Sequence, residues 1–306
     1  NPCIIAIEMG GIIGLNPVLA EKGNASDPES WLPSPMSTKS STPTIKKFEE
    51  LTIESQYTGG KKILILCTTK KFLQMKNGKY FNTGHQASET FLPIYHMAKC
   101  GFTFEVATPD GGPVAIEEWT FPMAVGYDDK LREVQTMLQD QLSAPKKMTD
   151  ILPGGTVNLE PYAAVFLPGG HGPVIEQHKI ESLGKILRAA HEISLPTISL
   201  CHGPSAFRAA AVGGEFPYKD YKLCVFPDKA DTLTPKFGYL PGYMKEEDMV
   251  EAQLKKLGML VQNKEMDDST CIDREMVTGA SQLASQTLAF AACRFLADKY
   301  EFTIKA

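Results

Sequence analysis

The feature that most constrains the fold is an alternation of short apolar runs with segments of helical spacing, which starts at Lys61. The run "KILILCT" (62–68) has the length and composition of a buried strand, and apolar residues at helical spacing follow at 87–98. Further strands are predicted at 102–109, 163–170, 196–201, 221–226, 259–262 and 271–278, and further helices at 128–142, 176–192, from Gly203, 246–257 and 281–298. This order predicts an α/β fold with a doubly wound parallel sheet that helices cover on both faces.

Two segments interrupt this pattern. Residues 1–60 show no sustained period and are rich in Pro, Ser, Thr and Lys, so we expect an irregular leader before an α/β domain of residues 61–306. Residues 110–160 mix a helical segment with Pro- and Gly-rich turns, which predicts an insertion or small cap beside the sheet.

Composition narrows the partners. The net charge is −5 and basic residues are scattered, so neither nucleic acid nor an anionic membrane is expected as a partner. The apolar opening contains Glu8, ends at Asn16 and has no basic n-region, which argues against a membrane span or a signal peptide. The 7 cysteines are widely spaced without a C-x-x-C pair, which favours free thiols in a reducing, cytoplasmic compartment.

The stretch "SLCHGPSAF" (199–207) carries the first candidate catalytic residue. It places Cys201 where a predicted strand ends and a helix begins, at the sheet edge where ligands bind in such folds. A sharp strand-to-helix turn exposes its central residue, and the helix N-terminus favours a thiolate, as in a nucleophile elbow. The alternative is a small buried hydrophobe, as we interpret Cys67, Cys224 and Cys293, and the spacing leaves both open.

A cysteine nucleophile needs a proton acceptor. Only His202 lies downstream of Cys201, which excludes the chain order of papain-like enzymes and of class I glutamine amidotransferases. The partner is therefore His202 or an upstream histidine; His178 and His191, on a helix that looks exposed, are interpreted as surface residues.

A second loop, "LPGGHGP" (167–173), follows another buried strand and is expected at the same edge of the sheet. Gly169 and Gly170 can turn backbone N–H groups toward a developing oxyanion. A plain strand-to-helix turn explains the glycines equally well. The loop is not a phosphate loop, because no G-K-[ST] follows.

Several motifs in register carry a resemblance that runs from about Lys61 to the last helix. They are "NTGHQASETFLPIYH", "FEVATPDG", "VFLPGGHGP", "ISLCHGPSAF", "CVFPDKAD", "GYLPG" and "REMVTGAS". In this order they resemble the ThiJ/PfpI superfamily, and within it the larger chaperone and glyoxalase III branch. The resemblance implies a flavodoxin-like sandwich, a homodimer and glutathione-independent conversion of methylglyoxal to lactate. Family members have also been described as holdase chaperones of unfolded proteins, deglycases and aminopeptidases.

The resemblance also implies roles for individual residues. Cys201 matches the family nucleophile, His202 its neighbouring histidine and Glu89 the glutamate that contacts the thiol. Asp231 matches the acid that orients the histidine, with Asp228 as its rival. The loop with Gly169, Gly170 and His171 is expected to bind the substrate oxygen.

The expected reaction starts with attack of Cys201 on the aldehyde carbon of a 2-oxoaldehyde, forming a hemithioacetal. Glu89 and His202 then move a proton through an enediol, and water hydrolyses the resulting thioester. This lyase chemistry requires no cofactor. The alternatives are a holdase and a cysteine-dependent hydrolase, either a deglycase or a peptidase.

This chain departs from the family pattern in two respects. Bacterial members of this branch bind zinc through two histidines and a glutamate, whose places are taken here by Ala98, Thr103 and Gln135, so no zinc is expected. The stretch "GHQASE" replaces the usual Asn-His-Pro before the glutamate, so the substrate mouth is expected to differ. We interpret His85, in this stretch, as a surface loop residue. The alternative is that its side chain enters the site.

Overall fold

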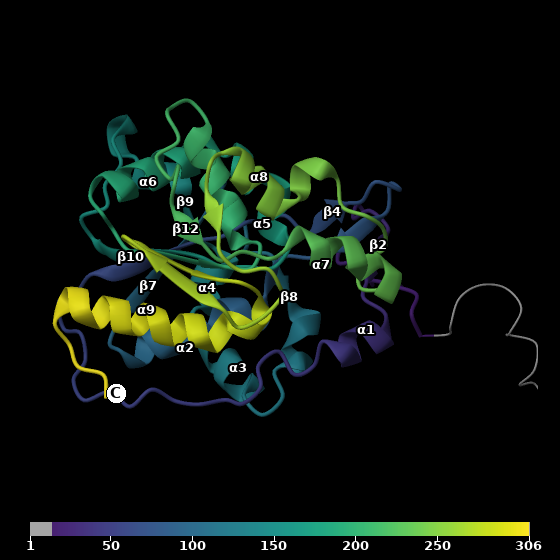
Figure 1. Cartoon of the computed structure of the whole chain (residues 1–306), viewed down its shortest axis with the longest axis horizontal. Coiled ribbons are helices and arrows are strands. Elements are labelled where there is room, and N and C mark those ends of the chain that lie inside the picture. The colour runs from purple at the N-terminus through teal and green to yellow at the C-terminus, as the bar shows by residue number, and fades with distance from the viewer. Residues whose placement is uncertain (1–13, 306) are drawn as a thin grey trace, which may run out of the picture.

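The computed structural model describes residues 14–305, and its centre is a seven-stranded sheet in the order β14-β15-β11-β10-β3-β7-β9 (Figure 1). β14 pairs antiparallel with β15, and the other neighbours in this sheet pair in parallel. The strands are β3 (Lys62–Leu66), β7 (Thr103–Thr108), β9 (Lys146–Lys147), β10 (Tyr162–Leu167), β11 (Thr197–Leu200), β14 (Thr270–Asp273) and β15 (Met276–Gly279). The predicted doubly wound α/β architecture is confirmed.

Helices cover both faces of this sheet. In Figure 1, α2, α3 and α9 lie below the sheet and α5, α6 and α8 lie above it. The α-helices that flank the sheet are α2 (Ala87–Lys99), α3 (Asp128–Met137), α4 (Gln139–Ser143), α5 (Gly172–Glu176), α6 (Glu181–Glu192), α8 (Val250–Lys256) and α9 (Ser285–Tyr300). The connections contain the short helix α7 (Asp228–Leu233) and 3-10 turns, of which η5 (Gly203–Ala211) follows β11.

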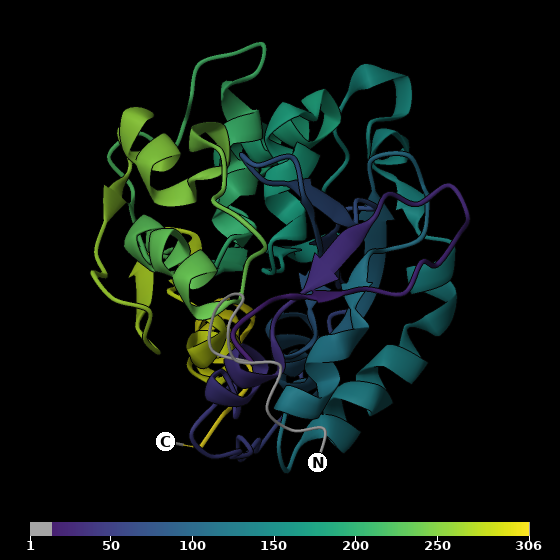
Figure 2. The ribbon, with the colours of Figure 1, turned by 90° about the vertical axis from the view of Figure 1, so that its right-hand side faces the viewer.

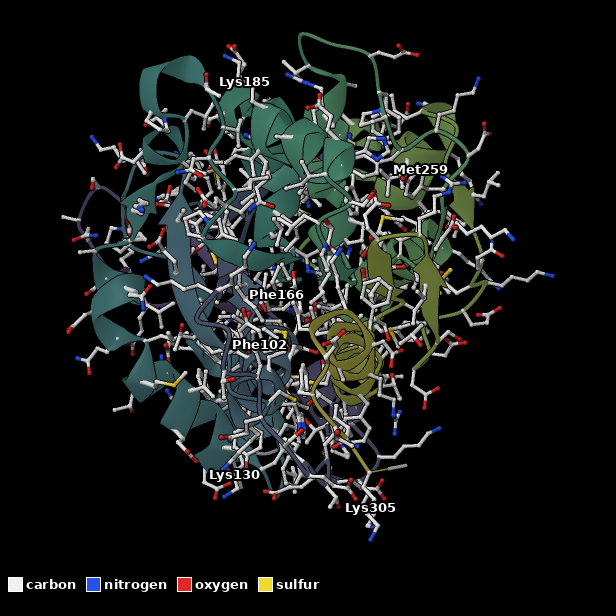
Figure 3. All side chains as sticks on the ribbon, turned by 90° about the vertical axis from the view of Figure 1, so that its left-hand side faces the viewer. Phe102, Lys130, Phe166, Lys185, Met259 and Lys305 are labelled. Atoms are coloured by element: carbon white, nitrogen blue, oxygen red, sulfur yellow. The ribbon has the colours of Figure 1, made fainter. Side chains whose placement is uncertain are left out.

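The apolar run of β3 shows how the sequence builds two cores. Ile63 and Ile65 point into the core between the sheet and helices α2 and α9. Leu64 and Leu66 point into the core between the sheet and helices α6 and η5. All four are buried, and each such side chain contributes about 1.5–3 kcal/mol relative to exposure. Figure 3 shows how side chains divide between interior and surface, with Phe166 in the interior and Lys130, Lys185 and Lys305 at the outside.

The segment before Lys61 is less irregular than the sequence predicts. Its strands β1 (Val18–Leu19) and β2 (Ser30–Leu32) join β5 (Tyr80–Asn82) and β4 (Phe72–Gln74) in a second, four-stranded sheet. Figure 2 shows the purple strand β2 beside blue strands from later in the chain, and β2 pairs with β5. Helix α1 (Pro35–Ser40) follows, with the Ser34 side chain accepting from the Ser37 N–H at its N-terminus. Strands of two or three residues are too short to give a recognisable period, which explains the difference.

Residues 110–160 are part of the main body. β8 (Ile116–Glu117) pairs with β6 (His85–Gln86), α3 packs on α2, and β9 forms the edge of the main sheet. The expected insertion is therefore built into the sheet edge and into one helix layer.

Several predicted elements differ in the structure. Residues 271–278 form the hairpin β14–β15 rather than one strand, because Arg274 adopts a φ of 56° and turns the chain. The predicted strand 221–226 contains only β12 (Lys222–Leu223), which pairs with β13 (Leu260–Val261) outside the main sheet. No helix in the described part of the chain has the length and apolar character needed to span a bilayer. The apolar opening considered for a signal peptide lies largely outside the described residues.

Candidate active site

Cys201 occupies a strained turn between β11 and η5. Its φ is 58°, in the left-handed region that a non-glycine residue rarely adopts. The backbone is fixed on both sides, since the Cys201 N–H donates to the Gly279 carbonyl at 3.0 Å and its carbonyl accepts from the Phe226 N–H at 2.9 Å. An added Cβ at Gly203 would lie 2.5 Å from the Leu167 carbonyl oxygen, so only glycine fits there. The turn has the geometry of a nucleophile elbow.

The environment of the thiol differs from the exposed thiolate that the sequence suggests. Cys201 is only 3% exposed, and burial together with the neighbouring Glu89 raises the pKa of its thiol well above the ordinary value. The His202 N–H acts in the opposite direction but is outweighed. The resting side chain is therefore a thiol, and its proton must leave when the sulfur attacks.

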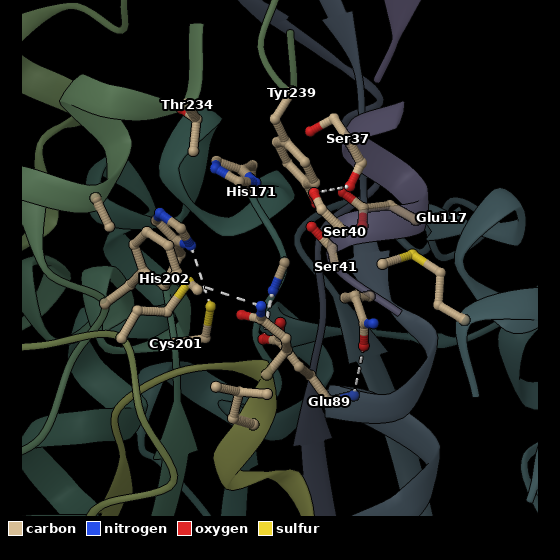
Figure 4. A pocket seen from close by; sticks show the side chains of 18 of the residues that line it. Ser37, Ser40, Ser41, Glu89, Glu117, His171, Cys201, His202, Thr234 and Tyr239 are labelled. Carbon is tan, nitrogen blue, oxygen red and sulfur yellow. Dashed lines mark hydrogen bonds between the residues drawn. The ribbon is translucent and has the colours of Figure 1, made fainter. Parts of the chain in front are cut away.

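His202 is placed to take that proton. Its Nδ1 lies 3.3 Å from Cys201 Sγ (Figure 4). Its Nε2 lies 2.9 Å from Asp231 Oδ2. The imidazole stacks on Phe226 with ring centroids 4.5 Å apart and packs on His171 at 4.0 Å. Burial disfavours the Asp231 anion, but His202 and His171 outweigh it and hold the pKa of Asp231 below its ordinary range. A buried carboxylate thus fixes the orientation of the imidazole.

The rival acid, Asp228, has a different task. Its Oδ1 accepts from the Glu251 N–H at 2.9 Å and its Oδ2 accepts from the Ala252 N–H at 2.8 Å. These are the first backbone N–H groups of α8, so Asp228 stabilises the start of that helix. Of the two aspartates, Asp231 is the one that contacts His202.

Glu89 lies in the first turn of α2 and faces the thiol. Burial and the neighbouring Glu117 raise the pKa of Glu89 to about 8, against hydrogen bonds from the Cys201 thiol and the Gly170 N–H. The Gly170 N–H donates to Glu89 Oε2 at 2.9 Å. At neutral pH the side chain is thus mainly in its acid form, beside the sulfur that would react.

The glycine loop holds this arrangement in place. At Gly169 an added Cβ would lie 1.8 Å from Glu89 Oε2 and 2.9 Å from Cys201 Cβ, so the missing side chain lets these two residues meet. The Gly170 N–H, which the sequence analysis assigns to an oxyanion, is occupied by Glu89. The His171 N–H likewise binds the Glu117 carboxylate. In this resting structure the loop positions the carboxyl groups of Glu89 and Glu117 through these two backbone N–H groups.

Glu117 is a pocket residue that the sequence analysis missed. It is 2% exposed, and its Oε1 accepts from the Thr83 hydroxyl at 2.5 Å. Burial raises the pKa of Glu117 to about 7, against the influence of His171 and several hydrogen bonds. The only available signal was its place in "EEWTFPMAVGY", a stretch that core packing explains equally well.

The remaining histidines are structural. His85 is fully buried rather than on a surface loop: its Nδ1 contacts the Gly169 carbonyl at 3.0 Å, and its Nε2 accepts from the Thr68 N–H at 2.9 Å. It braces the glycine loop without lining the pocket. His178 is also buried, and His191 lies 3.1 Å from Glu275, so neither is the plain surface residue that the helix suggests.

These residues open into a pocket of about 390 Å³. Cys201, His202 and Glu89 lie on one side of it, and Ser37, Ser40 and Ser41 of the N-terminal segment lie across from His202 (Figure 4). The other lining residues are Pro43, Gln86, Glu117, Met123, Gly170, His171, Phe226, Ala230, Leu233, Thr234, Phe237, Tyr239, Met266, Gln282 and Leu283. None of these described residues is a lysine or arginine, so the pocket suits an uncharged ligand.

One group of buried side chains near the thiol has the composition of a metal site. His171, His202 and Asp231 form a group whose ligand atoms lie within 4.8 Å of one another. Both imidazoles already use Nε2 toward this carboxylate, at 3.3 Å and 2.9 Å. At the position where the family resemblance implies a zinc site, the Gln135 amide donates to Glu118 at 2.6 Å, and Ala98, Thr103 and Gln135 include no histidine.

Comparisons with known proteins identify relatives of this chain. No family model matches the chain. It is 36% identical to the protein/nucleic acid deglycase HchA of Pseudomonas aeruginosa over 275 residues, which cover 89% of this chain and 93% of the relative. The identity to HchA of Escherichia coli is 35% over 263 residues, or 86% and 90% of the two chains.

Solved structures share the fold. Glyoxalase III of Candida albicans matches with a TM-score of 0.58 and 21% identity, over 76% of this chain and 96% of that one. The Francisella tularensis rapid encystment protein of 24 kDa matches with a TM-score of 0.60 and 18% identity, over 77% and 99%. The chain therefore belongs to the ThiJ/PfpI superfamily, in its branch of HchA-type and glyoxalase III-type proteins.

Proposed function

We propose that this protein is an enzyme that converts methylglyoxal to lactate without glutathione, with Cys201 as nucleophile. One observation carries the proposal: a single buried thiol contacts both the His202–Asp231 pair and a Glu89 side chain in its acid form. No lysine or arginine of the described chain lines the pocket, which suits an uncharged 2-oxoaldehyde. The HchA relatives are named as deglycases, which supports carbonyl chemistry at this site.

The first step joins sulfur to carbon. His202 Nδ1 takes the thiol proton while the sulfur attacks the aldehyde carbon, and the carbonyl oxygen receives a proton to complete the hemithioacetal. Asp231 stabilises the imidazolium that forms. Glu89 is the nearest acid for the new hydroxyl, because it hydrogen-bonds the same thiol.

The second step is an internal oxidation and reduction. Glu89, which has lost its own proton in the first step, now acts as a base. It removes a proton from the former aldehyde carbon, and an enediol forms. Return of a proton to the neighbouring carbon reduces the ketone to an alcohol and leaves a lactoyl thioester on Cys201. Water then splits the thioester, releasing lactate and restoring the thiol, so electrons balance without an external oxidant or reductant.

The test uses purified, reduced protein with methylglyoxal, without glutathione or added metal. We expect lactate from the intact protein and from Cys271→Ser, since that half-buried thiol lies outside the pocket, and none from Cys201→Ala or Glu89→Gln. Absence of lactate from the intact protein would reject the glyoxalase proposal. Equal activity in Cys201→Ala would reject the nucleophile.

A deglycase is the second candidate function. Leu233, Phe237 and Met266 line the pocket yet are 38%, 58% and 40% exposed, so its mouth has an apolar rim that can receive a group attached to a larger molecule. The relatives' name includes nucleic acid as well as protein, which weakens the exclusion of nucleic acid drawn from net charge. Release of methylglyoxal adducts from a purified glycated peptide, with free methylglyoxal removed by a scavenger, distinguishes this hydrolase from the lyase. A holdase would instead protect a client protein equally well as Cys201→Ser.

A further inference from the structure

The side chain of Gln86 has one end occupied and one end free. It lies at the N-terminus of α2, where its Oε1 accepts from the Glu89 N–H at 2.8 Å. This hydrogen bond fixes which end of the amide faces the helix. The other end, Nε2, has no hydrogen-bond partner although the residue is only 4% exposed.

Gln86 belongs to the lining of the pocket that contains Cys201. Among the described lining residues, its Nε2 is the buried side-chain nitrogen or oxygen without a partner. A buried donor that stays unpaired destabilises the protein, so such groups usually meet a partner from solvent or ligand.

Three other donors on this side of the pocket are already engaged. The Gly170 N–H binds Glu89, the His171 N–H binds Glu117, and the Thr83 hydroxyl also binds Glu117. An oxygen that enters the pocket therefore finds the Gln86 amide available without displacing an existing contact.

We propose that the Gln86 amide is a substrate-recognition donor, which binds an uncharged oxygen of the substrate in this pocket. The inference rests on the proposed function only in taking the pocket's ligand to be the substrate of Cys201. It gives a role to the "GHQASE" stretch, where this chain departs from its family. Since the cap on Glu89 holds the amide in place, the donor is oriented before the substrate arrives.

Two variants separate recognition from helix capping. Gln86→Met keeps the length but loses both amide functions, whereas Gln86→Ser restores a good N-terminal cap and lacks the amide. Their shared defect is the missing donor. We expect both to lower kcat/KM for methylglyoxal roughly 10- to 100-fold. Gln177→Met, which alters an equally buried amide outside the pocket, controls for lost stability.

A direct readout keeps this inference separate from the reaction. In 15N-labelled Cys201→Ala protein, the side-chain NH₂ signals of Gln86 are assigned by their loss in the additional Gln86→Met change and followed while methylglyoxal is added. We expect a downfield shift that saturates. If the signals shift but the intact protein forms no lactate, the proposed reaction is rejected and the role of the Gln86 amide as a donor is retained. No shift, or unchanged kcat/KM in both Gln86 variants, would overturn the donor even if lactate is formed.

Discussion

Asp228 and Asp231 both lie on α7, but their carboxylates point to different partners. Asp228 accepts two backbone N–H groups at the start of α8, whereas Asp231 accepts from His202 and His171. The same short helix thus connects the packing of α8 with the orientation of the catalytic imidazole.

This division predicts opposite effects for two matched variants. Asp231→Asn removes the negative charge that stabilises the imidazolium, and we expect kcat to fall by about 10²- to 10⁴-fold with little change in melting temperature. Asp228→Asn weakens the cap of α8 by about 1 kcal/mol and should leave kcat within a few-fold of the parent. Lactate assays and thermal melts of both proteins check this. The reverse pattern would assign the orienting role to Asp228.

Gly169→Ala should separate Glu89 from the thiol. The new Cβ would lie 1.8 Å from Glu89 Oε2, so the carboxyl group must move away from Cys201. We expect at least a 100-fold loss of kcat/KM, since proton transfer depends on that contact. Gly154→Ala is the control, because its Cβ meets nothing within 4 Å and costs only the strain of a positive φ. Full activity in Gly169→Ala would contradict the placement of Glu89.

The buried carboxyl of Glu117 should make the fold less stable as pH rises. Its pKa is raised by burial from 4.5 to about 7, so the native state holds a proton that the unfolded chain releases. The stabilisation is complete below pH 4.5 and is lost as pH rises to about 7. Urea unfolding at pH 5 and pH 8 should therefore show a smaller loss of stability in Glu117→Gln, by up to about 3 kcal/mol. An identical pH dependence in both proteins would contradict it.

The activity should fall at alkaline pH because Glu89 loses its proton. Burial and Glu117 hold the pKa of Glu89 at about 8, so its acid form, which we assign to the first step, disappears above that pH. Since the Glu117 charge contributes to this shift, Glu117→Gln should move the alkaline limb of kcat/KM to lower pH. Profiles from pH 6 to 10 give the comparison. A limb that stays in place would show that Glu117 does not act on Glu89.

Chelation should leave the activity unchanged. Ala98, Thr103 and Gln135 offer no customary zinc ligand at the position where the family resemblance implies a zinc site. Dialysis against EDTA, followed by lactate assay and metal analysis of the protein, tests this. Loss of activity that zinc restores would point to the His171–His202–Asp231 group as a metal site instead.

Sequence patterns were sufficient wherever one local signal determines the structure. The alternation in Ile63–Leu66 reflects burial on both faces of a parallel sheet, and the motif around Cys201 reflects a turn that only Gly203 permits. Features that depend on contacts between distant segments of the chain could not be predicted from the sequence. The pKa of Cys201 depends on burial by distant segments, and Glu117 reaches the site only because β8 pairs with β6.

Ser37, Ser40 and Ser41 form one wall of the pocket, although more than a hundred residues of chain separate them from Cys201. Part of the pocket wall is thus encoded in a stretch of the polypeptide separate from the one that carries the thiol. Changes in residues 37–43 can alter which molecules enter while the thiol, imidazole and carboxyl groups keep their spacing. This wall offers an engineer a surface to redesign that carries none of the residues assigned to the bond-breaking step.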